Sequence, residues 1–260
     1  MWNPQDYAKN SAAQLKWAQE LRSSITLQGH EAILDVGCGD GKITADFSRH
    51  LPNGTVTGID RSPEMVAYAA QTYPKMDYPN LTFACIDARK IPYKDSFDLI
   101  FSNAVLHWVD DHLAVLKGIS AALKPGGTVI ISCGGKGNAV QILQTVFEVA
   151  DRTRWRQYFN PLINPYFFHG PEEYLPWLNT SGLKPERLEL VPKDMIHEGK
   201  AGLASWLRTT WMPFTERVPI TEREQFIDEV VETYTSYFPP DAQGQVHVPM
   251  VRLEVVAYKP

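Results

Sequence analysis

Cysteine is scarce in this chain, and no apolar run is long enough to cross a membrane. The three cysteines, Cys38, Cys85 and Cys133, are an odd set without C-x-x-C spacing. This pattern argues against a disulfide framework and gives no support to a metal site, so we expect reduced thiols in a cytoplasmic protein. The first ten residues, MWNPQDYAKN, are polar and lack the apolar segment of a signal peptide, which agrees with that location.

Clusters of basic residues are also missing. The chain has 25 Lys and Arg residues against 30 Asp and Glu residues, a formal net charge of −5 at pH 7. A surface that binds nucleic acid or an anionic membrane is normally rich in Lys and Arg, so we expect neither partner. The 260 residues suffice for one α/β domain with an elaboration. The sequence leaves the oligomeric state open, with a monomer favoured.

Two common nucleotide-binding fingerprints are absent from the glycine-rich stretch near residue 40. Its glycines are Gly37, Gly39 and Gly41, so the spacing is G-x-G-x-G. A dinucleotide fingerprint needs G-x-G-x-x-G, and Lys42 stands where the last glycine is required. A P-loop needs Ser or Thr after the Gly-Lys pair, and Ile43 stands there instead.

What this stretch contains is a strand, a glycine turn and the start of a helix. Residues 32–36 are apolar except for Asp35, and KITADF follows the turn as the first helical residues. Glycine at 37 and 39 would let a ligand lie directly against the backbone. An acid at the end of the strand suits a cationic amino-acid group better than a pyrophosphate. We therefore predict that Asp35, Gly37 and Gly39 lie at a nucleotide-like ligand.

Two further acids follow predicted strands. Asp60 ends the strand TVTGID, where it is placed to accept hydrogen bonds from both ribose hydroxyls of a nucleoside. Ser62 is a predicted N-cap of the next helix, and Met65 either packs on an adenine ring or belongs to the core. Asp87 and Ala88 follow the third strand, and an aspartate there can also cap a turn.

Strands and helices alternate along the chain. The predicted strands cover residues 32–36, 55–60, 81–86, 97–102, 128–133, 185–191 and 249–258. This alternation predicts a Rossmann-like α/β fold, with a doubly wound, mostly parallel seven-stranded sheet and helices on both faces. Thr221 and Glu224 form a predicted capping box at the start of a long helix that ends near Tyr237.

The motifs along residues 33–133 resemble those of class I S-adenosylmethionine-dependent methyltransferases. They are D-x-G-x-G-x-G at the first strand, G-x-D at the second, D-A after the third, FDLIFSNAVLHW at the fourth and LKPGG before the fifth. The resemblance implies S-adenosylmethionine as cofactor, S-adenosylhomocysteine as product and no metal. It also implies that Asp87 pairs with the adenine amino group. The implied cofactor-binding residues are Asp35, Gly37, Gly39, Asp60, Arg61, Met65, Asp87, Ala88 and Asn103.

Two narrower resemblances concern the substrate. Residues 103–116, NAVLHWVDDHLAVL, and the tail 204–259 are similar to trans-aconitate methyltransferases. Residues 155–168, the triplet Leu106-His107-Trp108, Tyr7 and Gln14 also resemble insect juvenile hormone acid methyltransferases. Both families methylate a carboxylate oxygen, so the resemblance implies O-methylation of a small-molecule acid. The trans-aconitate family usually has Gln where this chain has His107.

The resemblance also implies a division of the chain and a set of site residues. Residues 1–30 would be an N-terminal helical lid, 31–133 the S-adenosylmethionine-binding core, and 134–199 its continuation with an aromatic lid segment. Residues 200–248 would be a helical substrate lid, and 249–260 the closing strand of the sheet. The implied catalytic residues are Gln14, His107 and Trp108. The implied substrate-binding residues are Tyr7, Gln14, Tyr166, Arg208 and Trp211.

A carboxylate acceptor would simplify the chemistry. It is ionised at pH 7, because its pKa is around 4, and it needs no general base. Charge disappears as the anion meets the sulfonium, so the protein's task is positioning and exclusion of water. One alternative is a carbon or hydroxyl O-methyltransferase of specialised metabolism, with His107 as the base. Another is a non-catalytic module that binds S-adenosylmethionine, since the fold does not exclude it.

Overall fold

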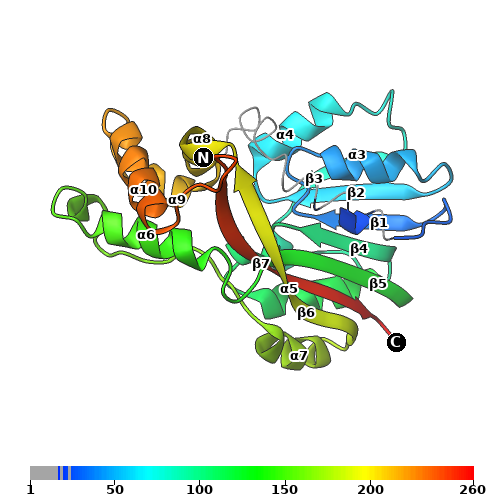
Figure 1. Ribbon diagram of the computed structural model, residues 1–260. Coiled ribbons are helices and arrows are strands. Elements are labelled where there is room, and N and C mark those ends of the chain that lie inside the picture. Colours follow the sequence, from blue (N-terminus) through cyan, green and yellow to red (C-terminus); the bar gives the residue numbers. More distant parts are fainter. Residues whose placement is uncertain (1–16, 18–19, 23–24) are drawn as a thin grey trace. The chain divides into compact units, whose positions relative to one another are not determined.

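The computed structural model describes residues 17, 20–22 and 25–260, so the predictions for Tyr7 and Gln14 lie outside the described residues (Figure 1). The strands are β1 (Ala32–Val36), β2 (Thr55–Asp60), β3 (Leu81–Cys85), β4 (Phe97–Asn103), β5 (Leu123–Gly134), β6 (Lys184–His197) and β7 (Val246–Tyr258). The α-helices are α3 (Lys42–Arg49), α4 (Pro63–Thr72), α5 (His112–Ala122), α6 (Val140–Ala150), α7 (Pro171–Thr180), α8 (Gly199–Thr210), α9 (Met212–Thr215) and α10 (Arg223–Tyr237). Short 3₁₀ helices are η1 (Ala88–Lys90), η2 (Leu106–Trp108) and η3 (Arg156–Tyr158).

β1 lies between β2 and β4 inside the sheet. Within the described residues the strand order is β3-β2-β1-β4-β5-β7-β6. Strands β1 to β5 pair in parallel, and β5 pairs with β7 in the antiparallel sense. This topology confirms the predicted Rossmann-like, doubly wound, mostly parallel seven-stranded sheet. The strand order reverses beside β1, and ligands of such sheets bind at the carboxyl ends of the strands at this switch point.

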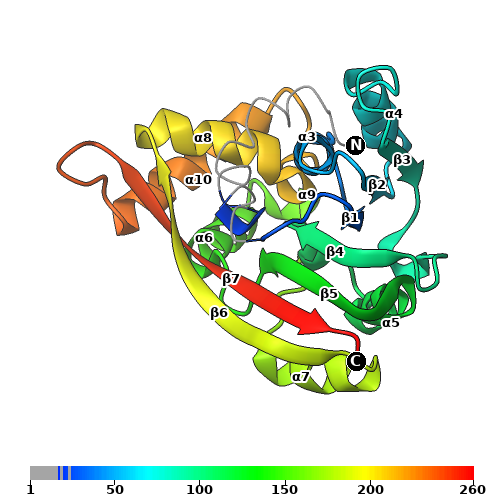
Figure 2. The same cartoon turned by 90° about the vertical axis from the view of Figure 1, so that its right-hand side faces the viewer.

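Helices cover both faces of this sheet. Figure 2 shows α3 and α4 on one face and α5 and α7 on the other. Successive side chains of a strand point to opposite faces, so alternate residues supply two separate cores. Ile33 and Leu99 pack with residues of α3, whereas Leu34 and Ile100 pack with residues of α5 and α7. Burial on both faces explains why the central strands are almost continuously apolar.

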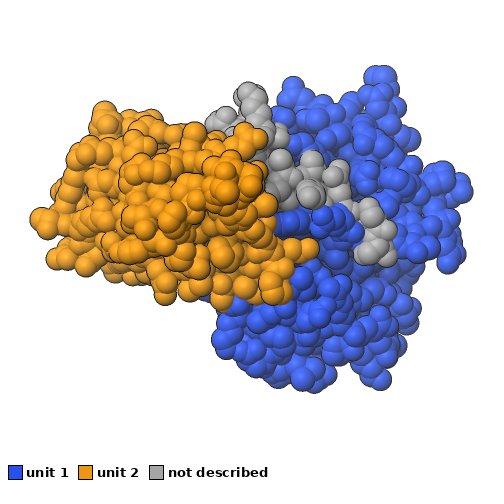
Figure 3. All heavy atoms as spheres, viewed as in Figure 1, with its two compact units in different colours: residues 1–136, 167–191, 252–260 blue, residues 137–166, 192–251 orange. Residues whose placement is uncertain are grey.

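The chain divides into two compact units (Figure 3). Unit 1 comprises residues 1–136, 167–191 and 252–260, and unit 2 comprises residues 137–166 and 192–251. Unit 1 contains β1 to β5 with α3, α4, α5 and α7, whereas unit 2 contains α6, α8, α9 and α10. The predicted substrate lid, residues 200–248, falls within unit 2, and the predicted segment 134–199 is divided between both units.

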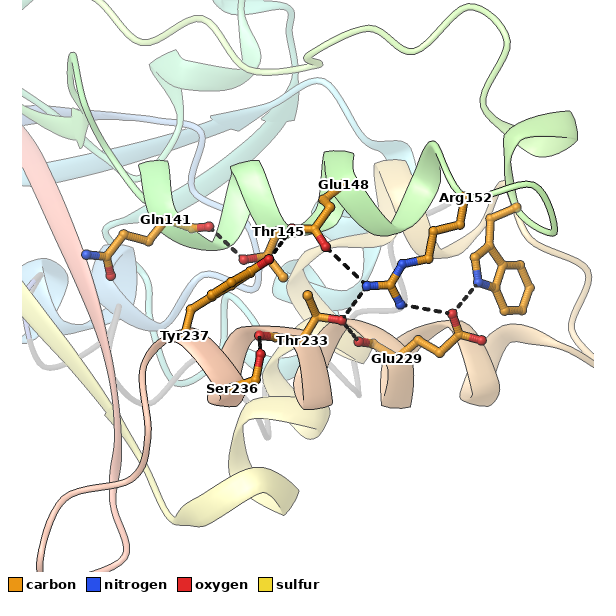
Figure 4. A network of polar contacts seen from close by, with 9 residues as sticks. Gln141, Thr145, Glu148, Arg152, Glu229, Thr233, Ser236 and Tyr237 are labelled. Carbon is orange, nitrogen blue, oxygen red and sulfur yellow. Dashed lines mark hydrogen bonds and ion pairs between the residues drawn. The ribbon is translucent and has the colours of Figure 1, made fainter.

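A buried tryptophan and a polar network join the region of α6 to α10 within unit 2 (Figure 4). The fully buried Trp155 donates its Nε1–H to Glu229 of α10 at 2.9 Å. Arg152 lies 3.4 Å from the same carboxylate, and it donates to the hydroxyl of Thr233 at 2.9 Å and to Glu148 at 3.2 Å. A buried indole N–H without an acceptor would be costly, so Glu229 helps to fix how these helices pack.

The predicted capping box at the start of α10 is wrong. The helix begins at Arg223, and Glu222 occupies the N-cap position without a side-chain cap. Instead, Glu222 accepts hydrogen bonds from Arg154 and from the hydroxyl of Tyr158, each at 3.1 Å. Both partners come from the segment after α6, so contacts distant in sequence replace the local motif that began at Thr221.

Candidate active site

The glycine turn after β1 is held against the end of β2. The backbone N–H groups of Gly37 and Cys38 both donate to the carbonyl oxygen of Ile59, at 2.7 and 3.0 Å. The N–H of Gly39 donates to the side chain of Asp60 at 3.1 Å. The turn ends at Gly41, the N-cap of α3, whose φ is 80°. These bonds bring the glycines and Asp60 together at the carboxyl ends of two neighbouring strands.

Gly37 is required by packing inside the protein. Its φ is +78°, and a Cβ atom there would lie 2.1 Å from Cγ2 of Val105. The sequence suggested that a ligand approaching the backbone would exclude a side chain at this position. The structure supplies a different reason, because Val105 already fills the space. Gly39 also has a positive φ, 53°, which glycine adopts without the steric cost that other residues incur.

Asp60 uses both carboxylate oxygens to hold the turns around it. Oδ2 accepts from the N–H of Gly39, and Oδ1 accepts from the N–H of Ser62 at 2.9 Å. Burial raises the pKa of Asp60, and the bonds from Ser62 and Gly39 act in the opposite direction. Each carboxylate oxygen can accept more than one hydrogen bond, so an oriented acceptor faces the switch point.

Asp35 is a buried acid in the strand next to Asp60, with only 3% of its surface exposed. The hydroxyl of Thr44 donates to its Oδ2 at 2.7 Å. Burial raises the pKa of Asp35 to about 7, and the charges of Asp60 and Asp40 act in the same direction. An acid held this far from water is a favourable partner for a cationic ligand group, because that group would supply the missing compensating charge.

The start of α4 agrees with the sequence analysis. Ser62 is the N-cap and accepts from the N–H of Met65 at 3.2 Å, and Pro63 occupies the first helical position. Met65 is buried, as either a core residue or a partner of a base would be. Arg61 lies between Asp60 and the cap in the sequence, and its charge offsets part of the rise in the pKa of Asp60 that burial causes. The cofactor roles of Arg61 and Met65 stay predictions.

Asp87 caps the short helix η1, which is the alternative role foreseen for it. Its Oδ1 accepts from the backbone N–H and Nε of Arg89, at 2.9 and 3.0 Å, and Oδ2 accepts from Nη2 at 2.6 Å. These bonds lower the pKa of Asp87 to about 2. Arg89 also reaches Asp110 at 2.9 Å. Pairing of Asp87 with adenine, beside the buried Ala88, stays a prediction.

His107 is a neutral side chain whose tautomer the structure defines. Its Nδ1 lies 3.1 Å from the backbone nitrogen of Gly134. A backbone amide can only donate, so Nδ1 is the acceptor and the ring proton is on Nε2. Burial lowers the pKa of His107 to about 3, with further contributions from the charges of Arg252 and His112. The imidazole packs beside Trp108 and Phe168, with ring centroids 5.3 and 6.0 Å apart.

Arg252 is a charged residue near His107 that the sequence analysis missed. Only 4% of its surface is exposed. Its guanidinium donates to Asn103 at 2.9 Å and to the carbonyl and hydroxyl oxygens of Ser132. Asn103 therefore contacts an arginine, and its predicted cofactor role stays a prediction. The sequence does contain a sign of this residue, because Arg252 is a charged residue within the mostly apolar last strand, VRLEVV.

Comparisons with known proteins agree with this geometry. Residues 34–131 match the model of the Methyltransferase domain family. A trans-aconitate 2-methyltransferase of Streptomyces avermitilis is 28% identical over 263 residues, which cover 99% of this chain and 97% of that protein. A second, from Streptomyces coelicolor, is 29% identical and covers 100% of this chain and 87% of that protein.

A solved structure shares the fold. Geranyl diphosphate C-methyltransferase of Streptomyces coelicolor, in complex with S-adenosyl-L-homocysteine, Mg²⁺ and geranyl diphosphate, superimposes with a TM-score of 0.55. Its sequence is 16% identical, and the match covers 95% of this chain and 81% of that chain.

The chain is a class I S-adenosylmethionine-dependent methyltransferase. Its cofactor is S-adenosylmethionine. The residues of the switch point fit this cofactor, because two acids, the buried Asp35 and the partly buried Asp60, lie beside a glycine turn. The cofactor combines a ribose diol, which Asp60 suits, with cationic groups, which Asp35 suits.

The remaining predicted substrate residues of the methyltransferase lie in unit 2. Tyr166 packs edge-on against Trp211, with ring centroids 5.7 Å apart, and burial raises the pKa of Tyr166. Arg208 forms a two-pronged ion pair with Glu224, including an Nε–Oε1 bond of 2.8 Å. Substrate binding by these three residues stays a prediction, and Arg208 has a second role in joining α8 to α10.

Among the residues that the structure describes, no group of three or more His, Cys, Asp or Glu side chains is arranged to hold a metal ion. Within the same part of the chain, no helix combines the length and apolar character needed to span a membrane.

Proposed function

We propose that this methyltransferase transfers the methyl group to a carboxylate oxygen of a small-molecule acid. Two observations support the proposal. The trans-aconitate 2-methyltransferases match the chain over nearly its whole length, although at only 28–29% identity. In addition, His107, which the resemblance places among the catalytic residues, is in a state that suits an acceptor which is already ionised.

The state of His107 is the observation that carries the proposal. The lone pair of Nδ1 is directed at the N–H of Gly134, and Nε2 carries the proton. A pKa of about 3 also makes the ring a weak base. His107 is therefore poorly suited to remove a proton from a hydroxyl or carbon acceptor. A carboxylate has already lost its proton at neutral pH, because its pKa is around 4.

The chain's own residues then have three tasks. S-adenosylmethionine, when bound, supplies a methyl group on a cationic sulfur. Asp60 accepts hydrogen bonds from the ribose hydroxyls, and Asp35 provides the negative charge near the cationic part of the cofactor. His107 donates Nε2–H to an oxygen of the acceptor. The aromatic side chains beside His107, Trp108 and Phe168, exclude water, which would otherwise stabilise the separated charges.

The departure from the trans-aconitate pattern at residue 107 has a physical explanation. Glutamine, the usual residue there, offers a carbonyl oxygen that can accept from Gly134 and an amide N–H that can donate to a substrate. The neutral tautomer of His107 offers the same two functions, Nδ1 as acceptor and Nε2–H as donor. His107→Gln should therefore retain most of the activity, whereas His107→Ala should lose both functions and much of the rate.

The test is methyl transfer from labelled S-adenosylmethionine to a panel of acids, phenols and active-methylene compounds. The panel includes trans-aconitate, other polycarboxylic acids and long apolar acids. We expect a methyl ester that base hydrolyses, and a rate that is flat between pH 6 and 9. Transfer to a phenol with a rate that rises near pH 7, lost in His107→Ala, would overturn the proposal. Tight cofactor binding without any transfer would indicate a non-catalytic module.

A further inference from the structure

A cluster of aromatic side chains in unit 2 contains buried polar atoms without hydrogen bonds. Trp206 packs against His197, with ring centroids 5.0 Å apart, and edge-on against Trp211, with centroids 5.4 Å apart. Only 8% of the surface of Trp206 and 8% of that of His197 is exposed. Within the described part of the chain, neither Nε1 of Trp206 nor Nε2 of His197 has a hydrogen-bond partner.

The fold brings these two rings together where β6 leads into α8 (Figure 2). His197 is the last residue of β6, and Trp206 lies on α8. Gly202 is four residues before Trp206, so the two residues share a face of the helix. A Cβ atom at Gly202 would lie 3.3 Å from Cβ of His197. Because Gly202 has no side chain, His197 can approach α8 closely enough to pack beside Trp206.

The unpaired atoms reduce the stability of the protein. An indole N–H can only donate, and a buried donor without an acceptor loses the hydrogen bonds that it would make with water. Trp155 in the same unit shows the usual arrangement, because its indole N–H donates to Glu229 at 2.9 Å. Buried polar groups are normally paired, so two neighbouring exceptions indicate a role other than packing.

The two rings define the kind of group that could bind to them. Burial lowers the pKa of His197 to about 4, so its ring is neutral at pH 7. The indole of Trp206 is neutral as well, and Arg208 on the same helix is bound to Glu224. A buried carboxylate needs a compensating cation, whereas a hydroxyl does not. A hydroxyl oxygen can accept from the indole N–H and can donate its proton to Nε2 of His197.

We propose that Trp206 and His197 bind a neutral oxygen, such as a hydroxyl, on the apolar part of the methyl acceptor. This inference rests on the proposed function and names the class of acid, a monocarboxylic acid whose apolar body carries a hydroxyl group. The predicted substrate residues Tyr166 and Trp211 belong to the same cluster, with ring centroids 5.7 Å apart. Their rings would contact the apolar body, and the two nitrogen atoms would select the hydroxyl.

The test measures kcat/KM for ester formation from ω-hydroxy acids, unsubstituted monocarboxylic acids and α,ω-dicarboxylic acids of matched, increasing chain length. The wild type should prefer the hydroxy acid to both other acids of the same length. Trp206→Phe keeps a ring without the N–H, and His197→Phe keeps a ring without the nitrogens. Each should lower the preference for the hydroxy acid over the unsubstituted acid by roughly twofold to tenfold. The Kd for S-adenosylhomocysteine should not change.

Two further measurements distinguish this role from a structural one. The double variant of Trp206 and His197 should lose little more preference than either single variant, because both side chains bind the same oxygen. The matched control is Trp155→Phe, which removes an indole that already has an acceptor. It should keep the preference and should lower the melting temperature more than Trp206→Phe, since only Trp155 gives up a hydrogen bond. Either single variant decides the question if the other does not fold.

The outcomes separate the two proposals. If the wild type forms no ester from any acid, the proposed function fails and the inference fails with it. If the wild type forms esters but prefers the dicarboxylic acid, or if Trp206→Phe and His197→Phe keep the preference for the hydroxy acid, only this inference is wrong. An unchanged preference with a melting temperature that falls as far in Trp206→Phe as in Trp155→Phe would indicate an internal water on the indole, and would also overturn it.

Discussion

The replacement Asp35→Asn should stabilise the cofactor-free protein, and the gain should grow with pH. Asp35 lies on β1, which is paired on both sides, and burial raises its pKa from 3.8 to about 7. The unfolded chain therefore releases this proton at a lower pH than the folded protein. Between the two pKa values the folded state binds more protons, so its stability falls as the pH rises.

The magnitude follows from the same shift. One pKa unit corresponds to about 1.4 kcal/mol, so the shift to about 7 costs the folded state about 4 kcal/mol at pH 8 and under half of that at pH 5. Asparagine is nearly isosteric and cannot ionise, and Thr44 can still donate to its oxygen. The stability difference between Asp35→Asn and wild type should widen by about 2–3 kcal/mol from pH 5 to pH 8.

Urea unfolding of the cofactor-free proteins at the two pH values measures this difference, with tryptophan fluorescence as the probe. Only the change with pH matters, so any constant cost of the asparagine amide cancels. Asp98→Asn is the matched control. Burial raises the pKa of Asp98, but the bonds from Ala32 and Lys124 outweigh this effect and hold it below its ordinary value.

The lowered pKa keeps Asp98 ionised at both pH values, so Asp98→Asn should lose the same stability at pH 5 and pH 8. A stability difference for Asp35→Asn that is also constant between these values would refute the reasoning. The same substitution removes the charge that we assign to the cationic part of the cofactor. Calorimetry should therefore show weaker S-adenosylmethionine binding by Asp35→Asn.

Three further predictions concern other parts of the chain. Asp60→Ala should weaken cofactor binding by roughly tenfold to a hundredfold in calorimetry, and Asp60→Asn should have a smaller effect because one acceptor oxygen remains. If Asp60→Ala binds the cofactor as tightly as the wild type, Asp60 does not bind the ribose. Gly37→Ala should lower the melting temperature, since its Cβ would lie 2.1 Å from Val105, and the added change Val105→Ala should restore part of the loss. A normal melting temperature for the single variant would contradict this packing. In unit 2, Glu229→Leu should reduce the free energy of unfolding by about 1–3 kcal/mol, because Trp155 loses its acceptor, whereas Glu229→Gln keeps one. Equal stabilities of these two variants would show that the indole bond is unimportant.

Local patterns were sufficient to predict the core of the fold. The strand, glycine turn and helix at residues 32–49 follow from apolar periodicity and from glycines that adopt positive φ. Ser62 caps α4 through a bond three residues along the chain, which a sequence motif can encode. The alternation of strands and helices restricts the connections of a parallel sheet, so the topology could also be predicted.

The sequence alone could not assign the roles that depend on distant partners. It predicted a capping box at Thr221 where Glu222 instead binds the segment after α6, and it gave no sign that Val105 fills the space beside Gly37. Cofactor binding at Gly37 stays a prediction. The sequence left open whether Asp87 would be a cap, and its bonds to Arg89 show that it is one.

The protonation state of His107 and the position of Arg252 were decided only by the tertiary structure. Arg252 and Asn103 are 149 positions apart in the chain. They meet because β5 lies between β4, which carries Asn103, and β7, which carries Arg252. His107 has its low pKa because burial removes water and because the charge of Arg252 is near. Periodicity specifies which face of a strand is buried, whereas charge, tautomer and pKa depend on which groups the folded sheet brings within a few ångströms of each other.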